Sequence, residues 1–173
     1  MSSSIINNGF RFVILLLFQV LILKRISVGW EGYLYINILL YPLFILLLPF
    51  RTPTPVVILL GFLMGLSVDL FYITPGVNAG ASVFTSFVRG FILNQLEPRG
   101  GYNINYSPTK ARMGSGWFFQ YAAILMLAHL FFYFSVEVFT YVYIVDILLK
   151  TFYSFIFSGL FIIIIMFIFN PKD

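Results

Sequence analysis

Charged side chains are scarce in this 173-residue chain. Asp, Glu, Lys and Arg together make up 9% of it, whereas hydrophobic residues make up 61%. A soluble domain carries roughly 25% charged residues, because its surface must be hydrated. The shortage argues strongly against a soluble domain. The surplus apolar surface must face something equally apolar, and a lipid bilayer is the obvious candidate.

Cysteine is absent, and His129 is the only histidine. The chain therefore has no disulfide framework, no thiolate metal site and no cysteine nucleophile. We interpret His129 as a packed side chain with one hydrogen bond rather than a metal ligand or proton relay. Zinc-protease, phosphate-loop and serine-nucleophile patterns are also missing. We therefore expect no catalytic residue, metal or cofactor, and a protein that is not an enzyme.

Long apolar runs occupy most of the chain. A bilayer core about 30 Å thick requires about 20 helical residues. We predict an all-α integral membrane protein with about six transmembrane helices, which form a single polytopic domain over residues 1–173. The predicted helices cover residues 10–23, 33–50, 55–72, 77–96, 117–138 and 142–169, and a polar loop covers residues 97–116.

Basic residues near helix ends indicate the orientation in the membrane, because cytoplasmic loops are enriched in Lys and Arg. With a cytoplasmic N-terminus, only Lys24 and Arg25 fall clearly on the outer side. The basic residues on or near the cytoplasmic side are then Arg11, Arg51, Arg99, Lys110, Arg112 and Lys172. We therefore place both termini and the loop in the cytoplasm. The net charge of +4 forms no basic patch with interleaved aromatics, so we expect no nucleic-acid binding.

The third predicted helix carries Gly61, Gly65 and Asp69 at intervals of four residues. On a helix these positions lie near one stripe, and small residues there let a neighbouring backbone approach closely. A carboxylate on the same stripe is turned toward protein rather than lipid. Intramembrane acids are costly and usually face a partner. We predict that this stripe is a helix-packing or partner interface, to which Gly76 also belongs.

Two interpretations of Asp69 remain open. It is either a structural carboxylate, in an ion pair or hydrogen-bonded at a helix end, or a proton or cation site. Helix depth at 1.5 Å per residue places Lys150 level with Asp69 and makes it the preferred partner. Asp146 lies four residues before Lys150 and supports local pairing. For Arg89, within the fourth helix, we expect the side chain to extend toward the cytoplasmic interface.

Three short stretches carry a resemblance to a known family. They are residues 48–51 (LPFR), 61–70 (GFLMGLSVDL) and 76–79 (GVNA). Together they resemble the signature region of the MreD rod-shape-determining membrane proteins. The specific part lies between residues 48 and 79, and the rest is similar in length and hydropathy.

The resemblance implies a multi-pass protein of the bacterial inner membrane that acts as a scaffold of the cell-elongation machinery. Members bind the bitopic protein MreC. Through it they link the MreB cytoskeleton to the peptidoglycan synthases, a SEDS glycosyltransferase and a class B penicillin-binding protein. Apart from membrane lipids, these are the partners that it implies. The family fold is similar to the substrate-binding subunit of energy-coupling-factor transporters. A vitamin-type binding subunit is therefore the alternative function, for which Trp30, Glu31, Tyr33 and Tyr35 are candidate lining residues.

Overall fold

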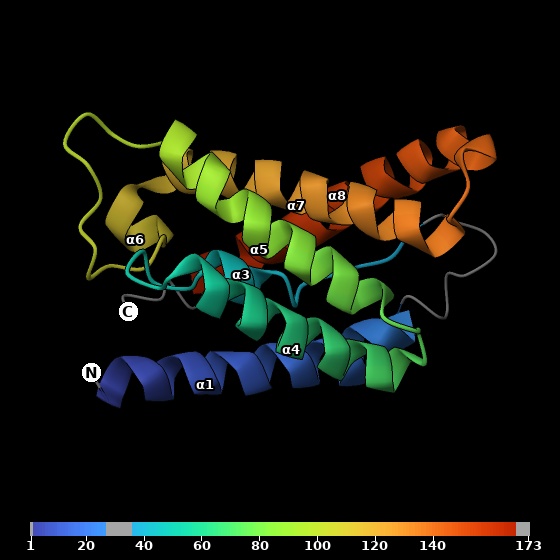
Figure 1. Ribbon diagram of the computed structural model, residues 1–173, viewed down its shortest axis with the longest axis horizontal. Coiled ribbons are helices and arrows are strands. Elements are labelled where there is room, and N and C mark those ends of the chain that lie inside the picture. The colour runs from blue at the N-terminus through green and yellow to red at the C-terminus, as the bar shows by residue number, and fades with distance from the viewer. Residues whose placement is uncertain (1, 27–35, 169–173) are drawn as a thin grey trace.

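The computed structural model describes residues 2–26 and 36–168, and all regular secondary structure in these ranges is helical (Figure 1). The long helices are α1 (Ser2–Phe18), α4 (Thr54–Tyr72), α5 (Val77–Gln95), α7 (Ser115–Val138) and α8 (Ile144–Ile168). The short elements are a π-helical turn η1 (Gln19–Leu23) that continues α1, α3 (Leu43–Leu46), α6 (Lys110–Met113) and a 3-10 turn η2 (Tyr141–Tyr143).

Four helical stretches within the described ranges are long and apolar enough to cross a membrane. They are Ile6–Ile26, Thr54–Tyr72, Ser115–Val138 and Ile144–Ile168. They correspond to the first, third, fifth and sixth predicted helices, and the all-α class is confirmed for these ranges. Helix α5 is as long as α4 but carries a row of buried polar side chains, which lowers its hydropathy.

The second predicted helix, over residues 33–50, is wrong. Residues 33–35 lie outside the described ranges, residues 36–40 have no regular secondary structure, and α3 is a single helical turn. Pro42 explains part of the difference, because proline lacks an N–H and disfavours helical conformation in the residue before it. Apolar composition predicted a transmembrane helix here, whereas the structure has a buried segment with a single helical turn.

The chain nevertheless returns through the bundle at this point. Helices α1 and α4 run in the same direction, so residues 36–53 lead from the end of one to the start of the other (Figure 1). Helices α4, α5, α7 and α8 then alternate in direction. The start of α1, α6 and residues 97–109 lie at one end, the loop end. The turns at residues 73–76 and 139–143 lie at the other, the turn end (Figure 1).

The centre of the bundle is filled by the chain itself. Every residue from 38 to 48 is buried, and Leu39, Leu40, Tyr41, Ile45 and Leu46 are completely inaccessible. We call residues 36–48 the buried return. It contacts side chains from α1, α5, α7 and α8, and Ile45 also approaches Gly61 on α4. The fold therefore consists of long helices arranged around a largely non-helical segment.

Candidate functional site

Asp69, near the end of α4, joins α4 to the start of α5. Its side chain is buried, and each carboxylate oxygen accepts hydrogen bonds. Oδ1 accepts from the Thr74 hydroxyl at 2.6 Å and from the Asn78 backbone N–H at 3.1 Å and side-chain amide at 3.0 Å. Oδ2 accepts from the Ala79 N–H at 2.8 Å. The first N–H groups of a helix lack partners within the helix and favour a negative charge, so Asp69 caps α5 from outside it.

The predicted ion pair between Asp69 and Lys150 does not form. Lys150 lies 3.6 Å from Glu137, at the end of α7, and both side chains are partly exposed. Asp146 is half-buried, and no ion pair joins it to Lys150 in the described ranges. Helix depth placed Asp69 and Lys150 at the same level but could not show which faces of α4 and α8 meet.

Gly61 and Gly65 lie directly against α5. A Cβ atom on Gly65 would come within 2.7 Å of three backbone atoms, the Asn78 oxygen and the nitrogen and Cα of Ala79. On Gly61 a Cβ atom would meet the Ser86 hydroxyl and, at 3.2 Å, the Ser82 carbonyl. The glycine stripe thus brings the two backbones together, and this approach places Asp69 on the first turn of α5.

Gly76 has a different place. It lies just before α5 with a φ of 81°, and no atom would contact a Cβ within 4 Å. Its role is therefore conformational, because the left-handed backbone of this turn favours glycine. It does not take part in the helix contact to which the sequence assigned it.

The buried return obtains its backbone hydrogen bonds from side chains of the surrounding helices. Gln19, fully buried in the π-helical turn, donates from its amide to the Ile38 carbonyl at 3.0 Å. Its side-chain oxygen accepts from the N–H groups of Leu40 at 2.7 Å and Tyr41 at 3.3 Å. Backbone polar groups away from water must be satisfied within the protein. One glutamine side chain thus supplies three backbone hydrogen bonds of the buried return that a neighbouring strand or helical turn would otherwise supply.

Two serines of α8 complete this support. Ser154 accepts from the Asn37 N–H at 2.9 Å, and Ser158 accepts from the Leu39 N–H at 3.0 Å. Their spacing of four residues places both on one face of α8, and the two residues that they bond, Asn37 and Leu39, are two positions apart. Sequence reasoning missed these serines. The available signal was a pair of serines four apart in the largely apolar part of α8 that follows Thr151.

Arg89 on α5 is buried and does not extend to the membrane interface as expected. Its Nε donates to the Tyr121 hydroxyl at 3.1 Å, and a terminal nitrogen donates to the Leu48 carbonyl. Tyr121 in turn donates to the Leu46 carbonyl at 3.1 Å. The Leu46 carbonyl belongs to the last residue of α3 and the Leu48 carbonyl lies two residues beyond it, where helical partners are lacking. A buried charge requires such hydrogen bonds, so Arg89 anchors the end of the buried return.

His129 is completely buried and makes two hydrogen bonds rather than one. Nε2 lies 2.8 Å from the Tyr41 hydroxyl, and Nδ1 lies 2.7 Å from the Thr85 hydroxyl. Thr85 donates its only proton to the Ala81 carbonyl at 2.8 Å, so it accepts from His129 Nδ1–H. Nε2 is then the acceptor for Tyr41. This neutral tautomer satisfies both ring nitrogens and ties the buried return to α5 and α7.

The four basic residues predicted for one face all belong to the loop end. Arg51 and Arg99 are exposed. The Lys110 Nζ lies 3.3 Å from the centre of the Phe167 ring, and the Arg112 Cζ lies 4.1 Å from the centre of the Tyr106 ring. Within the described ranges, no three acidic or histidine side chains gather as a metal site would require.

No protein-family model matches this chain, and neither curated proteins nor solved structures yield a match to it.

Proposed function

We propose that this protein is a membrane scaffold of the bacterial cell-elongation machinery, related to the MreD proteins, and that it is not an enzyme. The residues that carry the resemblance support the proposal by their arrangement. Gly61, Gly65, Asp69, Asn78 and Ala79 belong to two of the three stretches, and they meet at one contact between α4 and α5. These residues maintain a contact between two helices. A scaffold depends on such contacts, because they fix the outer surface to which its partners bind.

The observation that carries the proposal is the filled centre of the bundle. Ligand-binding sites are concave and leave room for their ligand between a few converging polar groups. Here the buried return occupies the centre, and its polar atoms pair with Gln19, Arg89, Ser154 and Ser158. The surface that remains for function is the outer one, where partners bind. The candidate vitamin-site residues Trp30, Glu31, Tyr33 and Tyr35 lie outside the described ranges.

We further propose six crossings of the bacterial inner membrane. The four apolar helices account for four of them, and α5 and residues 36–53 make the other two. The loop end, with Arg51, Arg99, Lys110 and Arg112, then faces the cytoplasm, because cytoplasmic ends are rich in Lys and Arg. The turn end faces outward and includes Glu137.

This topology is tested by cysteine labelling, for which the absence of native cysteine is an advantage. A cysteine in place of Gly100 should resist a membrane-impermeant maleimide in intact cells and react after the cells are opened. A cysteine in place of Thr140, at the turn end, should react from outside. Reaction of the first but not the second in intact cells would reverse the proposed orientation.

The scaffold function is tested by co-purification. The tagged chain is expressed in its own host with MreC, and the recovered complex is analysed for MreC, MreB and the two peptidoglycan synthases. We expect MreC to be enriched above the level recovered with an unrelated multi-pass protein. Gly65→Leu, which separates α4 from α5, should reduce this enrichment, whereas the control Gly116→Leu, where a side chain meets open space, should not. Background recovery of MreC with the intact chain would contradict the proposal. Recovery of a vitamin and a transporter's energising subunits instead would favour the alternative.

A further inference from the structure

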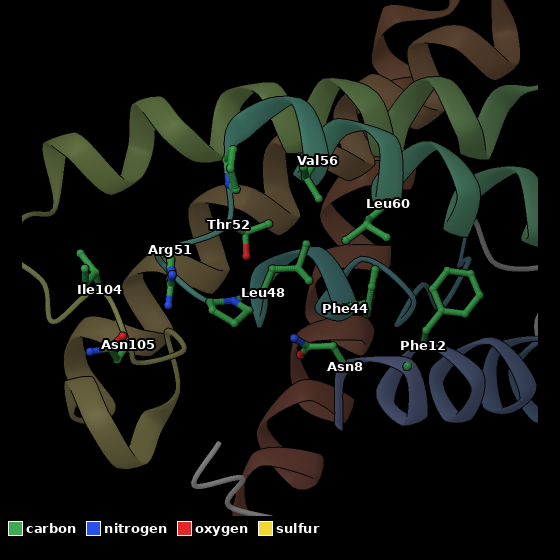
Figure 2. A pocket seen from close by; sticks show the side chains of 13 residues that line it. Asn8, Phe12, Phe44, Leu48, Arg51, Thr52, Val56, Leu60, Ile104 and Asn105 are labelled. Carbon is green, nitrogen blue, oxygen red and sulfur yellow. The ribbon is translucent and has the colours of Figure 1, made fainter. Parts of the chain in front are cut away.

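A groove of about 780 Å³ opens at the loop end, between α1, α4 and the chain that joins the buried return to α4. Its volume lies within the range of small-molecule sites, roughly 300–1,000 Å³. Figure 2 shows its two parts. Phe12, Phe44 and Leu60 lie together on one side, and Arg51, Thr52 and Asn105 lie on the other.

The apolar part follows the membrane-spanning portion of the fold. Phe12 belongs to α1, Phe44 to α3, and Val56 and Leu60 to α4. From Val56 to Leu60 the wall continues for about 6 Å along α4, at 1.5 Å per residue. Both α1 and α4 expose apolar side chains on their outer faces, among them Val13 and Leu59. A groove between two such helices is continuous with the acyl region of a bilayer.

The polar part lies where lipid headgroups would lie, at the end of these helices. Arg51 is exposed and, in the portion of the chain that the structure describes, has no hydrogen-bond or ion-pair partner. Asn8, Thr52 and Asn105 add further polar side chains to the lining of the groove. The described part of the loop end is also positively charged, with Glu97 as its one acid beside the four bases Arg51, Arg99, Lys110 and Arg112. This charge complements an anion.

We propose that the groove binds one anionic phospholipid, with its phosphate at Arg51 and an acyl chain along Phe12, Val56 and Leu60. Basic pockets between transmembrane helices recognise anionic headgroups in this way. A soluble anion would gain nothing from the apolar wall, and a lipid without net charge, such as phosphatidylcholine, would gain less from Arg51 because its own cation offsets the phosphate. The two halves of the groove therefore select the same ligand. The proposal holds whether or not the protein is a scaffold of cell elongation.

The test uses the full chain, purified in detergent and depleted of lipid, with phosphatidylglycerol and phosphatidylcholine as probes. Native mass spectrometry measures the apparent Kd of each lipid. We expect a preference for phosphatidylglycerol that Arg51→Gln lowers by about fivefold, the effect of one basic residue near an anionic headgroup. The control Arg99→Gln removes an equal charge from the same end outside the groove and should preserve the preference. If both variants lower it equally, the attraction is a general one and the site is refuted.

A second pair of variants tests the apolar wall. Leu60→Trp fills the groove from α4 and should weaken binding of both lipids, whereas Leu59→Trp, on the exposed face of the same helix, should not. Gel filtration and helical circular dichroism establish that each variant is folded, and a variant that fails is replaced by Val56→Trp on the same wall. Competition with millimolar inorganic phosphate should displace no lipid. Full displacement, or unchanged lipid binding in the groove-filling variant, would overturn the proposal.

Discussion

Asp69 offers the sharpest test of how α4 and α5 are joined. The carboxylate accepts four hydrogen bonds from three residues, Thr74, Asn78 and Ala79. In Asp69→Asn the remaining oxygen can keep the three bonds of Oδ1, but the amide nitrogen then meets the Ala79 N–H, donor against donor. A bond to a charged acceptor contributes roughly 1.5–3 kcal/mol. We therefore expect Asp69→Asn to lower the free energy of unfolding by about 2 kcal/mol.

Asp69→Ala removes all four acceptor interactions and leaves several buried donors without a partner. At roughly 1–3 kcal/mol for each unsatisfied group, the loss should reach about 4 kcal/mol or more. Equilibrium unfolding of the purified chain in mixed detergent and SDS micelles measures both values. Asp146→Asn is the matched control, because this half-buried acid caps nothing in the described ranges, and we expect a change within about 0.5 kcal/mol.

The result for Lys150 separates this account from an ion pair. Since Lys150 pairs with Glu137, adding Lys150→Met to Asp69→Asn should give no recovery of stability. Recovery would show that the two charges interact. An Asp69→Asn protein as stable as Asp146→Asn, or an alanine variant no worse than asparagine, would refute the capping role. An Asp69→Asn protein that assembles fully but fails in function would instead point to a proton-coupled role.

Three further outcomes follow from the same contacts. Gly65→Ala should lower the free energy of unfolding by about 1–3 kcal/mol through backbone overlap, whereas Gly116→Ala, in open space, should leave it nearly unchanged in the same SDS titration. Ser158→Ala should lower the free energy of unfolding by about 1–3 kcal/mol and speed amide exchange in the buried return, because the Leu39 N–H loses its acceptor. Ser67→Ala, which removes an exposed hydroxyl, is the control. Burial raises the pKa of Tyr102 from 10.0 to about 12. The contribution of the neutral phenol to stability should therefore be complete below pH 10 and disappear as the pH rises toward 12. Tyr102→Phe should abolish that part of the pH dependence of unfolding.

Much of the architecture was predictable from composition and spacing alone. A chain this poor in charge must cover its surface with lipid, and apolar runs of about 20 residues can satisfy their backbone only as helices. These two constraints are local, and they predicted four apolar helices within a few residues. The four-residue spacing of Gly61, Gly65 and Asp69 likewise indicated a single stripe before any neighbour was known.

The tertiary structure alone decided how the buried return is built and what Asp69 contacts. An apolar run has the same sequence pattern whether it forms a helix or a non-helical segment whose N–H and C=O groups are hydrogen-bonded by side chains of other elements. Here the partners are Gln19, Ser154 and Ser158, which lie 19 to 119 residues away in sequence. Depth in the membrane predicted Lys150 as the partner of Asp69. Hydrogen bonding also depends on the direction in which a side chain points around the helix axis. The close approach of the two backbones at Gly65 turns the Asp69 carboxylate toward α5. Such pairings are set by which helix faces meet, a property of the whole packed bundle and not of any one segment.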